Sequence, residues 1–232
     1  MPTAASSERP AGTVVVVCGG DAPAAASLPA LVREPGVYVV AADWGVDVAR
    51  ALGLVVDVAV GDFDSVSVVG LSRARSQGAE VDPHPAAKDE TDLELALRCA
   101  VDRQPERIVV VGGGGGRLDH LLGNVALLAA PFMAHVDVSA CLPGARLTVI
   151  RPGRDVLLCG APGDLLSLLP VHGLAVGVVT AGLRFALRHE DLPAGCSRGL
   201  SNVFDAATAT VAITGGVLLA IQPTAQPQED RT

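Results

Sequence analysis

Short apolar runs alternate with segments of helical period over the first 145 residues of this 232-residue chain. The runs, rich in β-branched residues, cover residues 13–18, 37–42, 55–60, 79–81, 108–111 and 136–141. The segments that favour helices lie between them, at residues 44–52, 66–77, 91–100 and 117–128. Strands that alternate with helices imply parallel pairing through right-handed crossovers. The pattern therefore predicts an α/β fold with an open, mostly parallel sheet and flanking helices.

After Pro143 the pattern changes. The later apolar stretches are short, most are separated by Gly or Pro, and none has a helical period; they cover residues 146–150, 155–159, 164–169, 174–180, 209–213 and 217–221. Several short strands with turn signals between them are typical of a small all-β sandwich. We therefore expect an α/β domain over residues 13–145, a β-sandwich domain over 146–222, and disordered tails at 1–12 and 223–232.

Charge and cysteine usage exclude several classes of partner and site. A net charge of −8 disfavours nucleic acid, although a divalent ion can still carry the phosphates of a nucleotide. No apolar run approaches the roughly 20 residues that a membrane helix needs. The five cysteines are widely spaced and contain no CxxC pair, which predicts reduced thiols, a cytoplasmic location and no cysteine metal site.

Two carboxylates follow the predicted strand 55–60 at once, in the segment Gly61-Asp62-Phe63-Asp64-Ser65. Ligands of open α/β sheets bind at the carboxyl ends of the strands, where this segment is expected. Acids this close repel one another unless a proton or a cation compensates, and Mg²⁺ shared with phosphate oxygens would do so. The alternative is an Asx-turn with solvated acids, which is favoured for an isolated Asp-x-Asp.

Further acids stand at comparable places: Asp43 after the second strand, and Asp89 and Asp92 at a helix start. A doubly wound sheet brings neighbouring strand ends together, so these carboxylates can converge in one crevice. Taken alone, Asp92 is better explained by a capping box in Thr91-Asp92-Leu93-Glu94. Lys88 could be a solvated charge or a phosphate clamp.

A run of five glycines, Gly112 to Gly116, precedes the helix expected at 117–128. No Gly-Lys-Ser/Thr follows, so the run is not a Walker A loop. Its backbone N–H groups could still hold phosphate, or the run could be a flexible turn. On the helix, Arg117, His120 and Asn124 share one side and Asp119 extends that arc, which is more typical of a face turned towards a ligand than of a solvated face.

The predicted sandwich contains one polar, glycine-bearing loop over residues 195–202. Its hydroxyls and amide could hydrogen-bond a heterocycle, or could simply close a long turn. Cys196 in this loop has no nearby basic residue in the sequence, so a passive thiol is the better interpretation than a nucleophile.

Together these pieces resemble the bacterial type of the thiamine pyrophosphokinase (thiamine diphosphokinase) family. The matching segments occur in the family's order over roughly residues 13–222: Ala42-Asp43-x-Gly45, Gly61-Asp62-Phe63-Asp64-Ser65, Lys88-Asp89-x-Thr91-Asp92-Leu93, Gly115-Gly116-Arg117-Leu118-Asp119-His120, Asn124, Thr180-x-Gly182-Leu183 and Gly199-x-Ser201-Asn202. Each motif alone is weak, but the ordered set is specific.

The resemblance implies an enzyme that transfers diphosphate from ATP to the hydroxyethyl group of thiamine, giving thiamine diphosphate and AMP. It implies a homodimer with the active site at the subunit interface. Catalysis and Mg²⁺ binding would fall to Asp62, Asp64 and Asp92. ATP and its phosphates would be bound by Asp43, Gly45, Ser65, Lys88, Asp89, Thr91, Arg117, Asp119, His120 and Asn124. Thiamine would be bound by Ser197, Ser201 and Asn202.

Two positions depart from the family pattern. Trp44 stands where many members have a small residue, and it could line the nucleotide pocket or only cap the helix. Leu219 stands near the place of a tryptophan that packs on thiamine in eukaryotic members. The alternatives to a thiamine enzyme are a pyrophosphokinase for another heterocyclic alcohol, such as a pterin, and an inactive relative that serves as a scaffold or sensor.

Overall fold

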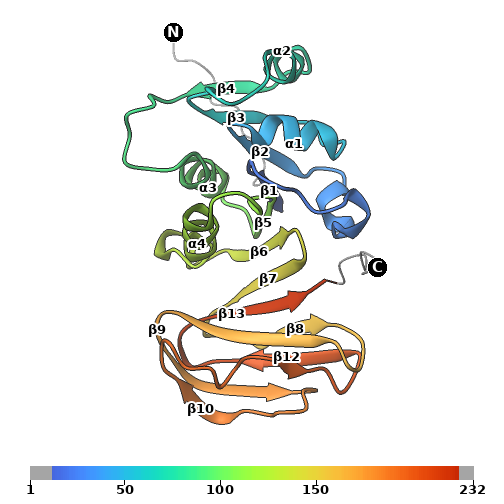
Figure 1. Cartoon of the computed structure of the whole chain (residues 1–232), viewed down its shortest axis with the longest axis vertical. Coiled ribbons are helices and arrows are strands. Elements are labelled where there is room, and N and C mark those ends of the chain that lie inside the picture. The colour runs from blue at the N-terminus through green and yellow to red at the C-terminus, as the bar shows by residue number, and fades with distance from the viewer. Residues whose placement is uncertain (1–11, 225–232) are drawn as a thin grey trace, which may run out of the picture. The chain divides into compact units, whose positions relative to one another are not determined.

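The computed structural model describes residues 12–224, which form two compact units (Figure 1). Unit 1 contains residues 12–18 and Pro29–Val109, and unit 2 contains Gly19–Leu28 and the chain from Val110 onward. Most residues of the predicted tails lie outside the described residues, but Gly12, Pro223 and Thr224 are ordered: Pro223 is the last residue of a strand, and Gly12 O and Thr224 N form backbone hydrogen bonds with Arg107 N and Gly144 O. The domain boundary expected near residue 145 stays a prediction.

Unit 1 contains a parallel sheet with the strand order β4-β3-β2-β1. The strands are β1 (Thr13–Val17), β2 (Tyr38–Ala42), β3 (Val58–Gly61) and β4 (Glu80–Pro83). Every residue of β1 and β3 is buried, as expected for strands covered on both faces. Because β2 and β3 run in parallel with Ala42 beside Val60, their carboxyl ends meet at one edge.

Helices cover the sheet of unit 1. They are the short 3₁₀ helix η2 (Ala30–Arg33), α1 (Gly45–Ala51), α2 (Val68–Ser76) and α3 (Asp92–Asp102). Figure 1 shows α1 and α3 on opposite sides of the strands. The apolar side chains of α3 at i, i+3, i+4 and i+7 are buried against β1, β2 and β3, which confirms the predicted periodicity. Strand β5 (Arg107–Val111) crosses the boundary between the two units.

Unit 2 begins with the segment that contains η1 (Ala25–Ser27), and after β5 it is rich in strands. Its elements are α4 (Leu118–Leu127), η3 (Pro131–Met133), β6 (Asp137–Leu142), β7 (Ala145–Ile150), β8 (Val156–Cys159), β9 (Leu165–Ala181), β10 (Arg188–Leu192), β11 (Asn202–Val203), β12 (Thr208–Ala212) and β13 (Gly215–Pro223). The strands from β6 onward pair antiparallel, in the order β6-β7-β13-β9-β12-β8, and β10 and β11 also pair with β9. The predicted β-rich C-terminal domain is confirmed.

Strand β9 corrects the prediction of separate strands at 164–169 and 174–180, because the chain continues as one strand of 17 residues. It bends at His172 and Gly173, which have φ values of 59° and 130°. The part before the bend pairs with β13, which also pairs with Val176 beyond the bend, and the part after the bend pairs with β10 and β12. Its side chains, including Leu168 and Val178, therefore enter one core from two sheet segments.

Two further observations bear on chemistry. All five cysteines are free thiols. None of the helices in residues 12–224 has the length and apolar character needed to cross a membrane.

Candidate active site

Three carboxylates come together in unit 1. Asp43 follows β2, Asp62 follows β3, and Asp92 is the first residue of α3. Each offers one oxygen, and these oxygens lie within 4.8 Å of one another. The convergence expected from strand ends at one sheet edge is therefore present, and hard oxygen ligands at this spacing suit Mg²⁺.

Gly61 lets the carboxylates approach. Its φ is +147°, a conformation that favours glycine. A Cβ atom there would lie 3.1 Å from Asp43 Cβ and 3.1 Å from Asp92 Oδ1. The backbone at Gly61 therefore lies close to both Asp43 and Asp92. A residue with a Cβ atom could be accommodated there only if neighbouring atoms moved.

The side chain of Lys88, the only lysine in the sequence, lies among the acids. Its Nζ is 3.3 Å from Asp62 Oδ2 and 3.0 Å from Asp92 Oδ1, and the side chain is only 11% exposed. Burial by itself lowers the pKa of Lys88, but its contacts with Asp92 and Asp62 outweigh that effect and raise it. Lys88 is therefore a fixed cation beside the three carboxylates.

One carboxylate oxygen of this group lacks a hydrogen-bond donor among the described residues. Asp43 Oδ2 accepts a hydrogen bond from the hydroxyl of Ser65, but Asp43 Oδ1 is buried without a donor. Asp92 Oδ1 is also buried, and its partner is the ammonium group of Lys88 at 3.0 Å. A buried carboxylate oxygen without a donor is costly, so Asp43 Oδ1 fits a site that a cation completes.

The pKa of Asp43 also fits a site that binds a cation. Burial is the main reason that the pKa of Asp43 is raised, and the negative charges of Asp92 and Asp62 add to it. The hydrogen bond from Ser65 and the nearby backbone N–H of Trp44 oppose this rise in pKa without cancelling it. A cation at the group would remove the repulsion among these acids.

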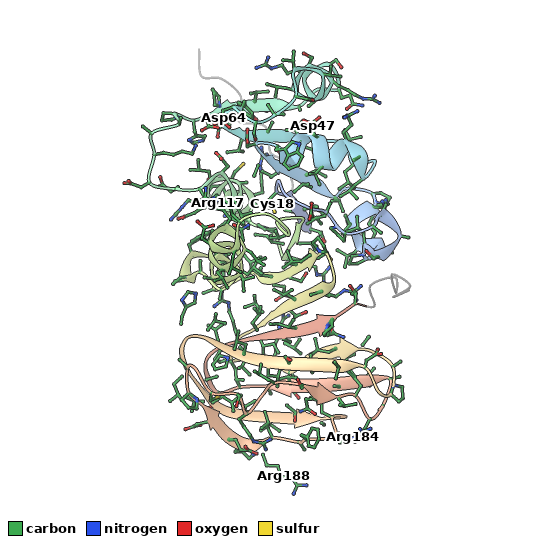
Figure 2. The ribbon with its side chains drawn as sticks, viewed as in Figure 1. Cys18, Asp47, Asp64, Arg117, Arg184 and Arg188 are labelled. Atoms are coloured by element: carbon green, nitrogen blue, oxygen red, sulfur yellow. The ribbon has the colours of Figure 1, made fainter. Side chains whose placement is uncertain are left out.

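Asp64 lies outside the group of three. It is exposed beyond the end of β3 (Figure 2), and its backbone N–H lies 3.4 Å from Asp62 Oδ1. This long contact is the Asx-turn that sequence analysis kept as the alternative for the Asp-x-Asp motif. The structure thus combines both interpretations, since Asp62 takes part in the turn and in the carboxylate group. A metal-binding role for Asp64 stays a prediction.

The start of α3 likewise combines capping with site geometry. Thr91 is the N-cap residue, and its Oγ1 accepts a hydrogen bond from Glu94 N at 3.2 Å. The reciprocal half of a capping box is replaced by an ion pair of Glu94 with Arg98, at 2.7 Å. Asp92 is thereby left to face Lys88, while Asp89 is exposed.

Gly45 and Trp44 follow Asp43 directly. A Cβ at Gly45 would lie 2.1 Å from the carbonyl oxygen of Val17, so this glycine allows α1 to pack on β1. Packing thus explains the glycine at position 45, and the binding of ATP phosphates by Gly45 stays a prediction. Trp44 makes no capping hydrogen bond through its side chain, which is 46% exposed.

The remaining residues predicted for ATP lie in unit 2, on α4 and at its N-cap. Arg117 and Asp119 form a two-point ion pair, with Nε–Oδ1 at 3.2 Å and Nη2–Oδ2 at 2.6 Å (Figure 2). The Arg117 hydrogen bonds lower the pKa of Asp119 to about 2. His120 is exposed and Asn124 is partly buried.

The glycine run pairs with a second glycine-bearing segment, which sequence analysis did not connect with it. Asp21 N donates to Gly114 O at 2.8 Å, and Gly113 N donates to Gly19 O at 2.9 Å. A Cβ at Gly115 would lie 2.1 Å from the Asp21 carboxylate. The run is thus an ordered turn whose glycines permit close contact between two loops.

Of the three residues predicted to bind thiamine, one is buried and two are exposed. Asn202 is buried, its Oδ1 accepts from Phe185 N at 3.0 Å, and its Nδ2 donates to Phe185 O at 2.8 Å. Ser197 and Ser201 are exposed, and Ser201 N donates to Ser167 Oγ at 3.1 Å. The amide of Asn202 therefore holds Phe185, whose side chain is 52% exposed.

Sequence analysis did not single out Phe185. Its exposed side chain and its two backbone hydrogen bonds with Asn202 make it part of the region predicted to bind thiamine. The signal was an aromatic residue two positions after the family segment Thr180-x-Gly182-Leu183, in a chain with only four phenylalanines. Leu219, by contrast, is completely buried in β13 and presents no surface to a ligand.

Comparison with known proteins gives two matches to models of domain families. Residues 32–140 match the model described as thiamin pyrophosphokinase, catalytic domain, and residues 154–218 match thiamin pyrophosphokinase, vitamin B1 binding domain. Together the matches cover well over half of the chain. A curated relative, thiamine pyrophosphokinase of Bacillus subtilis (strain 168), is 26% identical over 212 residues, which are 91% of this chain and 99% of the relative.

Solved structures of thiamine pyrophosphokinases are also similar to this chain. A crystal structure of thiamine pyrophosphokinase from Bacillus subtilis has a TM-score of 0.78 at 25% identity, covering 92% of this chain and 100% of that chain. Thiamin pyrophosphokinase from Geobacillus thermodenitrificans has a TM-score of 0.74 at 26% identity, covering 92% and 98%. The enzyme from Candida albicans, at 14% identity and a TM-score of 0.73 over 91% and 89%, shares the fold.

Proposed function

Because the chain belongs to the thiamin pyrophosphokinase family, we propose that it transfers diphosphate from ATP to the hydroxyethyl oxygen of thiamine. The alcohol oxygen forms a bond to the β-phosphorus, and the bond from that phosphorus to the oxygen bridging the α-phosphorus breaks. AMP leaves with the bridging oxygen, and the hydroxyl proton passes to a base. The observation that carries the proposal is the group of three carboxylates with Lys88 at the carboxyl edge of a parallel sheet.

The proposed metal ligands are Asp43, Asp62 and Asp92, because their oxygens converge and Asp43 Oδ1 is buried without a donor among the described residues. Mg²⁺ bound there would supply charge neutralisation on the phosphate oxygens of ATP. Lys88 adds a positive charge held in place by two of the acids, ready to stabilise phosphate oxygens. Asp64, exposed next to the group, is proposed as a further carboxylate for catalysis and metal binding.

For the nucleotide, the proposed contacts in unit 2 are Arg117, His120 and Asn124, with Asp119 fixing the Arg117 guanidinium. For thiamine, the exposed hydroxyls of Ser197 and Ser201 are proposed to bond the heterocycle. We assign Asn202 to positioning, because its amide is engaged with the backbone of Phe185. Ser65, Asp89, Thr91 and Gly45 would support the phosphate side from unit 1.

A homodimer and a cytoplasmic location complete the proposal. Helix α4 has no buried residue, and Leu118 and Leu122 are 68% and 61% exposed. Apolar side chains presented by one helix in this way are typical of a surface that a partner covers. The five free thiols agree with a reducing compartment.

The deciding experiment incubates the full chain with thiamine, ATP and Mg²⁺ and identifies the nucleotide product by chromatography. We expect AMP and thiamine diphosphate in equal amounts. Formation of ADP, or product from a hydroxymethylpterin but none from thiamine, would contradict the proposal.

A further inference from the structure

Asp21 lies where the loops that follow two neighbouring strands meet. The loop after β1 contains Gly19, Gly20 and Asp21, the loop after β5 is the glycine run 112–116, and both loops belong to unit 2. In the strand order β1 lies between β2 and β5, so the chain leaves β1 for one neighbour and returns through α3 to the other. Open α/β sheets bind ligands in the crevice outside the carboxyl ends of the strands, at such a reversal.

Backbone hydrogen bonds fix the loop that contains Asp21. Asp21 N donates to Gly114 O at 2.8 Å, and Gly114 N donates to Asp21 O at 3.3 Å. The carboxylate lies against the next glycine, since a Cβ atom at Gly115 would be 2.1 Å from Asp21 Oδ2. Asp21 is exposed, and its carboxylate accepts no hydrogen bond from the residues that the structure describes. The backbone is therefore fixed, while the carboxylate oxygens stay available to a ligand.

The glycine run suits a neutral ligand group better than a phosphate. The N–H groups of residues 112–114 already donate to backbone carbonyl oxygens, at 2.9 to 3.3 Å. The negative charge of Asp21 beside Gly115 would repel a phosphate at the N–H groups that remain. A carboxylate instead accepts strong hydrogen bonds from hydroxyl groups. The two loops therefore favour a part of the ligand that presents hydroxyls.

ATP presents such a group, because its ribose carries adjacent 2′ and 3′ hydroxyls, whereas the hydroxyl of thiamine is the group that reacts. Acidic residues accept a hydrogen bond from the ribose 2′-hydroxyl in dinucleotide-binding sheets. We propose that Asp21 binds the ribose hydroxyls of ATP and thereby selects ribonucleotides over 2′-deoxyribonucleotides as diphosphate donors. The inference rests on the proposed function, and it adds a residue that determines the choice of nucleotide.

The competing explanation is that Asp21 only joins the two loops. The hydrogen bonds that join them use the backbone atoms of Asp21, and residues other than aspartate could supply these atoms. They do not account for the carboxylate. It occupies the space that is left because residue 115 is a glycine, with φ of +70°.

The test measures the binding of ATP and of 2′-deoxy-ATP, each with Mg²⁺ and without thiamine, by isothermal titration calorimetry on the full chain. We expect the wild type to bind ATP about tenfold more tightly, because 2′-deoxy-ATP lacks the donor of a charge-assisted hydrogen bond. Asp21→Ala should bind ATP about tenfold more weakly than the wild type and leave the affinity for 2′-deoxy-ATP within about twofold. Asp155→Ala, which removes an exposed carboxylate between β7 and β8, should keep the wild-type preference.

Two glycine variants test the same contact if Asp21→Ala does not fold. Gly115→Ala adds a Cβ atom where the Asp21 carboxylate lies, so the preference for ATP should disappear. Gly116→Ala is the matched control. Gly116 also has a positive φ, +63°, but no atom lies within 4 Å of the place of its Cβ, so this variant should keep the preference.

The outcomes separate this inference from the proposed function. Equal affinity of the wild type for the two nucleotides, or an equal loss of affinity for both in Asp21→Ala, would overturn the role of Asp21 and leave thiamine transfer untouched. Because binding is measured without thiamine, a failure of thiamine transfer would not change the expected preference. A wild-type protein that binds neither nucleotide would overturn both proposals.

Discussion

Gly61 shows how a single residue decides whether the acids can meet. Substitution with alanine adds a Cβ that lies 3.1 Å from both Asp43 Cβ and Asp92 Oδ1, on a backbone with φ of +147°. We expect Gly61→Ala to lower the free energy of unfolding by about 1–3 kcal/mol and to reduce turnover at least about a hundredfold. Urea unfolding and release of AMP measure the two effects.

Gly78→Ala is the matched control. Gly78 also has a positive φ, +100°, but no atom lies within 4 Å of the place of its Cβ. This variant should lose stability through the same kind of backbone strain and keep its activity. If both variants lose activity equally, the contact of residue 61 with Asp43 and Asp92 is not the cause of the lower turnover.

Lys88 provides a second prediction at the scale of the residue. Lys88→Met removes the positive charge that forms ion pairs with Asp62 and Asp92. Without it the three acids repel one another, so the melting temperature in EDTA should fall and the rise on adding Mg²⁺ should exceed that of the wild type. Turnover should fall by about two to three orders of magnitude, because a phosphate-stabilising charge is lost.

Differential scanning fluorimetry with and without Mg²⁺ measures the stability part. Arg50→Met, which removes an exposed cation on α1 that pairs with Asp47 (Figure 2 labels Asp47), is the control and should show the wild-type response to Mg²⁺. A wild-type protein whose melting temperature does not change with Mg²⁺ would contradict the assignment of the carboxylates as ligands.

At the scale of the element, the first turn of α3 determines where Asp92 lies. Thr91→Ala removes the hydrogen bond from Glu94 N and should cost about 1 kcal/mol of stability. We also expect lower turnover, because a frayed first turn no longer holds Asp92 beside Lys88. Thr91→Ser keeps the acceptor oxygen and should retain both stability and activity. Chemical denaturation and initial rates distinguish the two variants.

The elements themselves were largely predictable, and the misses have physical reasons. β10 was missed because its residues are mostly charged or polar, and it forms only as a strand paired with β9. β9 was divided in two because His172 and Gly173 resemble a turn, yet the chain bends there without leaving the sheet. The predicted strand at 55–60 begins only at Val58, and Val55 is exposed.

At the scale of the whole molecule, α4 carries the prediction about assembly. Leu118→Glu combined with Leu122→Glu places two charges on its exposed apolar side. If this surface is covered in a homodimer, the double variant should have the mass of one chain while the wild type has that of two, because buried like charges oppose association. Light scattering after size-exclusion chromatography measures both masses.

Val68→Glu serves as the control, since Val68 is 83% exposed on α2, a helix that already buries Gly70 and Ala74. It should leave the wild-type mass unchanged. A single-chain mass for the wild type would contradict the dimer itself, and a two-chain mass for the double variant would exclude α4 from the interface.

The sequence by itself determined the class of each part, the order of most elements and the candidate acids, because hydrophobic period and residue chemistry are local properties. The ligand set Asp62, Asp64 and Asp92 came from the resemblance to the family, since Asp92 taken alone is better explained as a capping residue. Only the tertiary structure decided that Asp43 completes the group while Asp64 lies outside it. That choice depends on the register of β2 and β3 and on the passage of Gly61 between the acids, and neither can be read from spacing along the chain.

The same distinction applies to Asn202. Sequence analysis expected the Asn202 amide to contact a ligand, but folding brings Phe185 to it and both sides of the amide are engaged there.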